Sequence, residues 1–232
     1  MKTFSSDHNF PRQKNSIPCN FWMAEDILAD SPGHLHAYVM IRSPKSHVLS
    51  QYFHCTESTD HKYARHLMPA LDDWLDTHVK KVHTMKNMSM DIGRDHGPGE
   101  LFKCYDPINM QSHYTDFDDS VYESDLRSRF GVIGIMDQFG KSVCALSIRY
   151  TGLVPPSCNC TRKTNRRLNN DHGVTHHGST FNVTDSQLRK ISQITELDTL
   201  LYSQAKLAFA QQVLDIEDDF DIVLCNNPRM DD

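Results

Sequence analysis

Two short apolar runs stand out in the pattern of hydrophobic and polar positions. Residues 36–41 (H-A-Y-V-M-I) and residues 130–136 (F-G-V-I-G-I-M) are the runs with this character. Short, continuous apolar runs are typical of strands that are buried in a parallel sheet. Each run is followed by a helical pattern, over residues 45–54 and residues 138–148, so the sequence predicts two strand–helix units.

Three further segments carry helical spacing. Residues 21–30 predict a short helix, residues 62–86 predict a longer one, and residues 186–214 predict a long amphipathic helix. Because strands alternate with helices along the chain, the sequence predicts an α/β fold with a mainly parallel sheet.

The same pattern divides the chain into three parts. Residues 1–20 are polar and lack periodicity, so we expect coil that is in part disordered. Residues 21–214 are expected to form one domain, because a chain of 232 residues is long enough for a sizeable core. Residues 215–232 are acidic and are expected to form a loose tail.

Composition and charge exclude some classes of protein. The formal net charge is −6, which argues against a protein whose main role is to coat nucleic acid. No apolar run approaches the length of about 18 residues that a transmembrane helix needs. The first residues lack the apolar core of a secretory signal, so we expect either a cytosolic protein or an incomplete N-terminus.

Cysteines and glycosylation sequons bear on the compartment. The chain has seven cysteines, an odd number, so at least one has no disulfide partner within the chain. N-x-[S/T] sequons occur at Asn87, Asn159 and Asn182. These sequons favour a secretory lumen without excluding chance occurrence.

The segment after the first strand has the chemistry of a phosphate site. Arg42 follows Ile41 at the carboxyl end of the predicted strand, where ligands bind in open α/β sheets. Pro44 suits the first turn of the next helix, and Ser50 lies about two turns into it. A guanidinium can bind a phosphate through two hydrogen bonds, and a hydroxyl and the helix N-terminus can add to it. The alternative is an ordinary surface arginine and a serine without a role.

The segment 38–52 (Y-V-M-I-R-S-P-K-S-H-V-L-S-Q-Y) resembles the 3′-phosphate motif of sulfotransferases that use 3′-phosphoadenosine-5′-phosphosulfate (PAPS). Three later segments resemble the carbohydrate-type, Golgi-resident branch of that family. They are C-Y-D-P-I-N-M-Q at 104–111, the strand and helix at 130–146, and I-T-E-L-D-T-L-L-Y-S-Q-A-K-L-A-F at 194–209.

The resemblance implies a fold and an activity. It implies a three-layer α/β sandwich similar to nucleotide kinases, with Arg42 and Ser50 binding the 3′-phosphate of PAPS. The implied reaction is transfer of a sulfuryl group to a hydroxyl of a carbohydrate acceptor. By the same resemblance the protein would reside in the Golgi lumen or membrane, whereas the absence of a nucleic-acid partner is expected from the net charge alone.

One signature of the family is not found in the sequence. The family's first strand ends in a loop of the P-K-T-G-T-T kind, which holds the 5′-phosphosulfate, and here Lys2-Thr3 is only a faint echo of it. We therefore expect the chain to be truncated at its N-terminus, with that strand and loop missing. His8, Glu25 and His34 are weak candidates for the catalytic base. A truncated, non-catalytic fragment is the alternative interpretation.

The segment 158–177 has two further interpretations. Its basic residues, Arg162 and Lys163 above all, would form a loop that closes over the nucleotide, as a late basic loop does in related sulfotransferases. A solvated run of charge explains the same residues equally well. A zinc-stabilised binding module is the third hypothesis, with ligands drawn from Cys158, Cys160, His172, His176 and His177.

Overall fold

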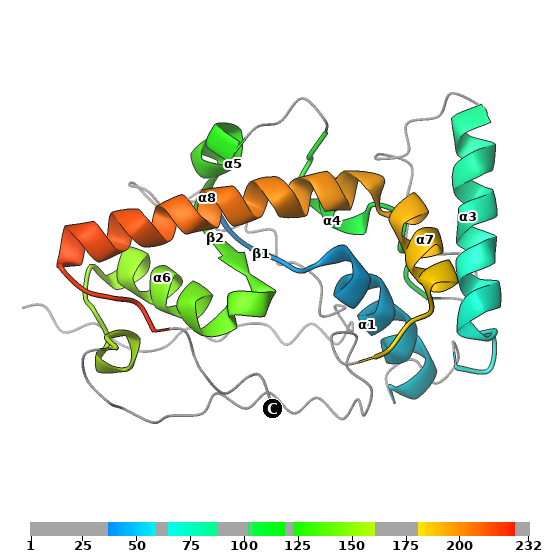
Figure 1. Ribbon diagram of the computed structural model, residues 1–232, viewed down its shortest axis with the longest axis horizontal. Coiled ribbons are helices and arrows are strands. Elements are labelled where there is room, and N and C mark those ends of the chain that lie inside the picture. Colours follow the sequence, from blue (N-terminus) through cyan, green and yellow to red (C-terminus); the bar gives the residue numbers. More distant parts are fainter. Residues whose placement is uncertain are drawn as a thin grey trace, which may run out of the picture.

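The computed structural model describes residues 37–58, 65–87, 102, 104–118, 123–160 and 181–225. The order of elements is β1 (Ala37–Ile41), α1 (Pro44–Glu57), α3 (Leu71–Asn87), α4 (Met110–Tyr114), α5 (Glu123–Arg129), β2 (Phe130–Ile135), η2 (Met136–Gln138), α6 (Phe139–Thr151), η3 (Pro156–Cys158), α7 (Asp185–Ile194) and α8 (Glu196–Phe220). Figure 1 shows α8 running past both strands along much of the molecule.

The two predicted strands pair with each other. β1 and β2 are parallel neighbours, and Ile41 lies opposite Ile135 at their carboxyl ends. Both strands and the helices that follow them, α1 and α6, lie close to their predicted positions. In the described part of the chain the sheet has these two strands, and the three-layer, kinase-like sandwich stays a prediction.

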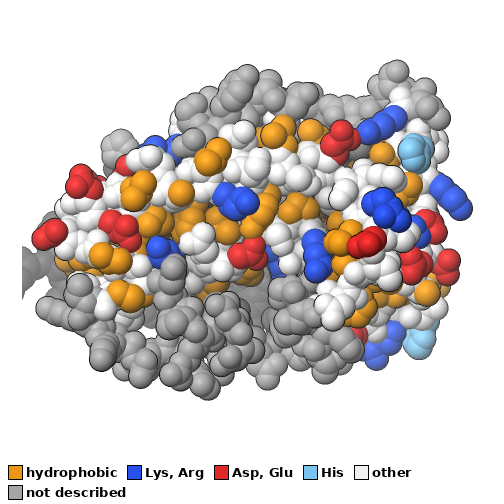
Figure 2. All heavy atoms as spheres, viewed as in Figure 1, with side chains coloured by type: hydrophobic (Ala, Val, Ile, Leu, Met, Phe, Trp, Pro, Cys, Tyr) orange, Lys and Arg blue, Asp and Glu red, His pale blue; other side chains and the backbone are white. Residues whose placement is uncertain are grey.

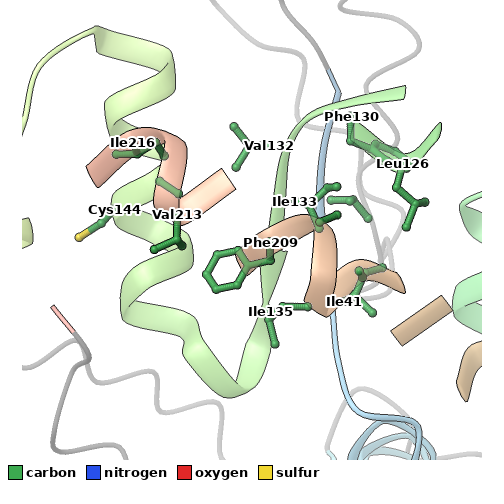
Figure 3. Packing of buried hydrophobic residues seen from close by; sticks show 14 of the residues in the cluster. Ile41, Leu126, Phe130, Val132, Ile133, Ile135, Cys144, Phe209, Val213 and Ile216 are labelled. Carbon is green, nitrogen blue, oxygen red and sulfur yellow. The ribbon is translucent and has the colours of Figure 1, made fainter. Parts of the chain in front are cut away.

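The main core lies between the sheet and the helices on either side of β2 in the sequence. Helices α5, α6 and α8 all pack against β2. Figure 3 shows Phe209 and Val213 of α8 facing the side chains of β2, with Cys144 of α6 close by. Burying such apolar side chains removes their surface from water and stabilises the domain.

A second core lies at the other end of the molecule. Helices α1, α3 and α7 form a group there (Figure 1), and their apolar side chains make a separate cluster around Trp74. On the face drawn in Figure 2, hydrophobic side chains are interspersed with charges of both signs. On that face, recognition of an anion would therefore depend on local groups, since no broad basic surface is visible.

The C-terminal third differs from the prediction in two ways. The helix predicted over 186–214 is two helices, because α7 ends at Ile194 and α8 begins at Glu196. The loose tail predicted from residue 215 is wrong for residues 215–225. There α8 continues to Phe220, and Ile216 and Leu224 are buried in the main core. Apolar residues at the helical spacing outweigh the acidic ones between them.

Some other predictions have partial outcomes. The helix predicted over 62–86 corresponds to α3, which begins only at Leu71. The predicted helix at 21–30 and the predicted coil at 1–20 lie outside the described residues.

Six cysteines form three disulfides. They join Cys55 to Cys104, Cys144 to Cys158 and Cys160 to Cys225, with Cα–Cα distances of 6.0, 5.5 and 4.9 Å. Among the described helices, none is both long and apolar enough to cross a membrane.

Candidate functional site

Arg42 lies where the sequence placed it, at the carboxyl edge of the sheet. It follows the last residue of β1, and Asp137 lies two residues beyond the end of β2. Because the strands are parallel neighbours, both side chains belong to the same edge. Burial lowers the pKa of the Arg42 guanidinium, and the charge of Asp137 partly offsets this effect. An arginine side chain stays protonated in proteins, so Arg42 is a cation.

The N-terminus of α1 follows at once. Ser43 is the N-cap residue and its side chain makes no capping hydrogen bond, while Pro44 occupies the first turn. No acidic residue lies in that turn. The first amides of a helix lack partners within the helix and carry positive potential, so this end of α1 favours an anion.

His47 and Ser50 lie three residues apart and therefore share a face of α1. Within the described part of the chain, the Nδ1 of His47 is buried without a hydrogen-bond partner. Burial, and then the charge of Arg42, lower the pKa of His47 to about 3. His47 is thus neutral at pH 7, and it is close enough to Arg42 for the charge of Arg42 to lower its pKa.

Sequence reasoning missed His47, although its three-residue spacing from Ser50 was a usable signal. The described residues provide no hydrogen-bond partner for the guanidinium of Arg42 or the hydroxyl of Ser50. An arginine, a hydroxyl, a neutral imidazole and a helix N-terminus together could hold one phosphate group.

The other side of Arg42 is formed by Asp137 and the helix α8. The hydroxyl of Tyr202 donates a hydrogen bond to the carboxylate of Asp137. Burial raises the pKa of Tyr202, and Asp137 raises it further, so the phenol stays protonated. The Nζ of Lys206 lies 4.8 Å from the centre of the Tyr202 ring. The motif at 194–209 and the motif at 130–146 thus meet beside Arg42.

The segment 104–111 reaches Arg42 from another direction. The Oε1 of Gln111 accepts a hydrogen bond from the backbone N–H of Arg42 at 2.8 Å, and the Nε2 of Gln111 donates to the carbonyl of Arg42 at 2.9 Å. The segment is also tied to its surroundings, because Cys104 is bonded to Cys55 of α1 and Asp106 accepts from Lys81 of α3.

Helices α4 and α8 cap each other. The Oδ1 of Asn109 accepts from the backbone N–H of Leu197 at 2.9 Å, in the first turn of α8. In return, Asp198 accepts from the backbone N–H of Ser112 at 2.7 Å and of Gln111 at 3.3 Å, in the first turn of α4. Thr195, the N-cap residue of α8, makes no side-chain cap of its own, so the cap comes from a distant segment.

The remaining candidate residues have no described position. His8, Glu25, His34, Arg162 and Lys163 lie outside the described residues, so the catalytic base and the covering loop stay predictions. Cys158 and Cys160 each form a disulfide and offer no thiolate to a metal. The zinc hypothesis therefore loses the two cysteines on which it was built. Its three histidines lie outside the described residues.

No protein-family model, curated protein or solved structure matches this chain.

Proposed function

We propose that this protein binds PAPS and transfers its sulfuryl group to a hydroxyl of a carbohydrate. The observation that carries the proposal is the convergence of four sequence segments on Arg42. Arg42 itself belongs to the first segment, Gln111 of the second holds its backbone, and Asp137 and Tyr202 of the third and fourth lie beside it. These are the four segments that resemble sulfotransferase motifs.

The groups at this edge suit the 3′-phosphate of the donor. Arg42 supplies a cation whose guanidinium has no hydrogen-bond partner among the described residues, although the charge of Asp137 acts on it, and Ser50 supplies a hydroxyl from α1. The N-terminus of the same helix adds positive potential. Charge-assisted hydrogen bonds to a phosphate are stronger than neutral ones, so the 3′-phosphate would account for much of the binding free energy.

The proposed reaction is a direct displacement at sulfur. The acceptor oxygen forms a bond to sulfur while the bond from sulfur to the oxygen of the donor's 5′-phosphate breaks. The hydroxyl proton passes to a base, and the products are a sulfate ester and adenosine 3′,5′-bisphosphate. The reaction is accelerated when donor and acceptor are held in line and when the charge on the leaving oxygen is stabilised.

Two features support a lumenal, Golgi-type location for this activity. Three disulfides among the described residues are typical of proteins that fold in an oxidising compartment. The sequon at Asn182 is exposed, just before α7, where a glycan could be attached.

The proposal is tested by binding of adenosine 3′,5′-bisphosphate and of adenosine 5′-monophosphate, measured by calorimetry on the full chain. We expect the bisphosphate to bind more tightly, because only it carries the 3′-phosphate. Arg42→Ala should weaken the bisphosphate by roughly ten- to a hundredfold, equivalent to about 1.4–2.8 kcal/mol, and leave the monophosphate unchanged.

Arg149→Ala is the matched control. Arg149 lies in the last turn of α6, about 15 Å along that helix from its start, and removal of its charge should change neither affinity. Equal binding of the two nucleotides by the wild type would contradict the proposal. Sulfate transfer from PAPS to a carbohydrate is then assayed separately. Binding without transfer would favour the non-catalytic alternative.

A further inference from the structure

The side chain of Gln111 holds the backbone of Arg42 through two hydrogen bonds. This side chain is fully buried, and both functions of its carboxamide are used, one on the N–H and one on the carbonyl of Arg42. A neighbouring strand offers a residue the same pair of bonds. Gln111 therefore continues the hydrogen bonding of β1 by one residue past its end, at the arginine of the proposed phosphate site.

Gln111 is itself fixed by the reciprocal caps between α4 and α8. Its own N–H donates to Asp198, and the next residue, Ser112, donates to the same carboxylate through its N–H and its hydroxyl. Helix α8 packs against β2, which is the strand beside β1. The place of the Arg42 backbone is thus set by α8 through Asp198 and Gln111.

A second glutamine makes the same arrangement within β2, where it also lines a pocket with Arg127 and Arg149. The Oε1 of Gln212 accepts from the N–H of Ile133 at 3.1 Å, and its Nε2 donates to the carbonyl of Ile133 at 3.1 Å. Ile133 is a buried core residue within β2. Gln212 bonds to the backbone within β2, whereas Gln111 bonds to the backbone just past the end of β1. Gln212 therefore provides an internal reference for what this interaction does to stability.

We propose that Gln111 is a positioning residue: it fixes the backbone of Arg42 so that the guanidinium meets the 3′-phosphate of the donor nucleotide. This inference rests on the proposed function. Its physical basis is preorganisation, because an arginine whose backbone is already fixed loses less conformational freedom when it binds. Loss of Gln111 should therefore weaken recognition of the 3′-phosphate specifically.

The test compares Gln111→Met with Gln212→Met, which keep the side-chain length and remove both hydrogen bonds. We expect both variants to melt at a lower temperature than the wild type. Gln111→Met should bind adenosine 3′,5′-bisphosphate about tenfold more weakly, which corresponds to about 1.4 kcal/mol of binding free energy. It should bind adenosine 5′-monophosphate as before, and Gln212→Met should bind both as the wild type does.

A double-mutant cycle separates positioning from general damage. If Gln111 acts through Arg42, Gln111→Met should have no further effect on bisphosphate affinity when Arg42 is already alanine. Gln111→Asn is the second variant should Gln111→Met fail to fold, because it keeps an uncharged carboxamide and only shortens the side chain by one methylene. It should weaken the bisphosphate by a smaller factor.

The outcomes distinguish the inference from the proposed function. Equal effects of the Gln111 and Gln212 variants on bisphosphate affinity would overturn the inference. Full additivity with Arg42→Ala would also overturn it, while the proposed function would stand. If the wild type shows no preference for the bisphosphate, the proposed function fails and the inference fails with it.

Discussion

Asp198 is a fully buried carboxylate at the junction of α4 and α8. It accepts hydrogen bonds from the N–H of Gln111 and from the N–H and hydroxyl of Ser112. Burial raises its pKa to about 6, although these hydrogen bonds act in the opposite direction. The cost of desolvation thus exceeds the gain from three donors, and Asp198 binds a proton more tightly in the folded chain than in the unfolded one.

This raised pKa predicts a pH dependence of stability. The stabilising contribution of Asp198 protonation is fully present below its unfolded pKa, near 4, and is lost as the pH rises through about 6. Asp198→Asn puts an NH₂ group among donors and should cost about 1–3 kcal/mol at pH 7. Its deficit in unfolding free energy should grow as the pH falls from 7 to 4, measured by urea unfolding.

Asp72→Asn provides a control of opposite sign. Hydrogen bonds from Gln187 and Lys190 lower the pKa of Asp72, so its contribution is present above the unfolded pKa and is lost as the pH falls. The deficit of Asp72→Asn should therefore shrink toward low pH. If the loss of unfolding free energy in Asp198→Asn stays constant between pH 7 and pH 4, the pKa of Asp198 is not raised in the folded protein.

At the scale of elements, α6 is held very close to β2. The hydroxyl of Ser142 accepts from the N–H of Ile135 at 2.8 Å, and the carbonyls of Ile135 and Gln138 each lie 3.0 Å from it as acceptors. A Cβ at Gly134 would lie 3.0 Å from the Cβ of Ser142 and 2.8 Å from the Sδ of Met40. Gly134 is needed because Ser142 of α6 and the side chain of Met40 occupy the space that a Cβ would fill.

Gly134→Ala should consequently destabilise the protein by about 1–3 kcal/mol, the usual cost of overpacking a core. Chemical unfolding measures the change. Met40 is flexible and Ser142 is not, so Met40→Ala should relieve part of the strain, and the double variant should lose less stability than the sum of the single variants. If the losses of the two single variants add up to that of the double variant, the contact with Met40 is not the cause of the destabilisation by Gly134→Ala.

The sequence predicted those elements that depend on local pattern. β1, β2, α1 and α6 follow from short apolar runs and helical spacing, and the place of Arg42 follows from the end of β1. The break at Thr195 was not predicted, because the cap that begins α8 comes from Asn109, far away in the sequence. The role of Gln111 was missed for the same reason: a carboxamide that bonds to backbone leaves no signal in spacing.

At the scale of the molecule, disulfides join segments that are distant in sequence. Counting cysteines left every pairing open, because pairing depends on which side chains the fold brings together. Cys55–Cys104 joins α1 to the segment before α4, and Cys144–Cys158 joins α6 to η3. Cys160–Cys225 joins the chain two residues after η3 to the chain after α8, beside the backbone bridge of Asn159 with Leu224.

Sequence separation predicts how much two of these bonds stabilise the fold. Cys144 and Cys158 are 14 residues apart, and Cys160 and Cys225 are 65 apart. Since a cross-link removes more freedom from a longer unfolded loop, removal of the first pair should cost about 3 kcal/mol and of the second about 4 kcal/mol.

The two bonds are removed as the double variants Cys144→Ala/Cys158→Ala and Cys160→Ala/Cys225→Ala, so that no free thiol is left to pair elsewhere. Unfolding by guanidinium measures both variants against the wild type, and peptide mapping without reductant verifies the remaining pairs. The smaller loss should follow removal of Cys144–Cys158, because that bond closes the shorter loop, and both variants keep Cys55–Cys104. A reversed order would show that the cross-links stabilise the native packing rather than limit the unfolded chain. Linked peptides other than these pairs would contradict the pairing itself.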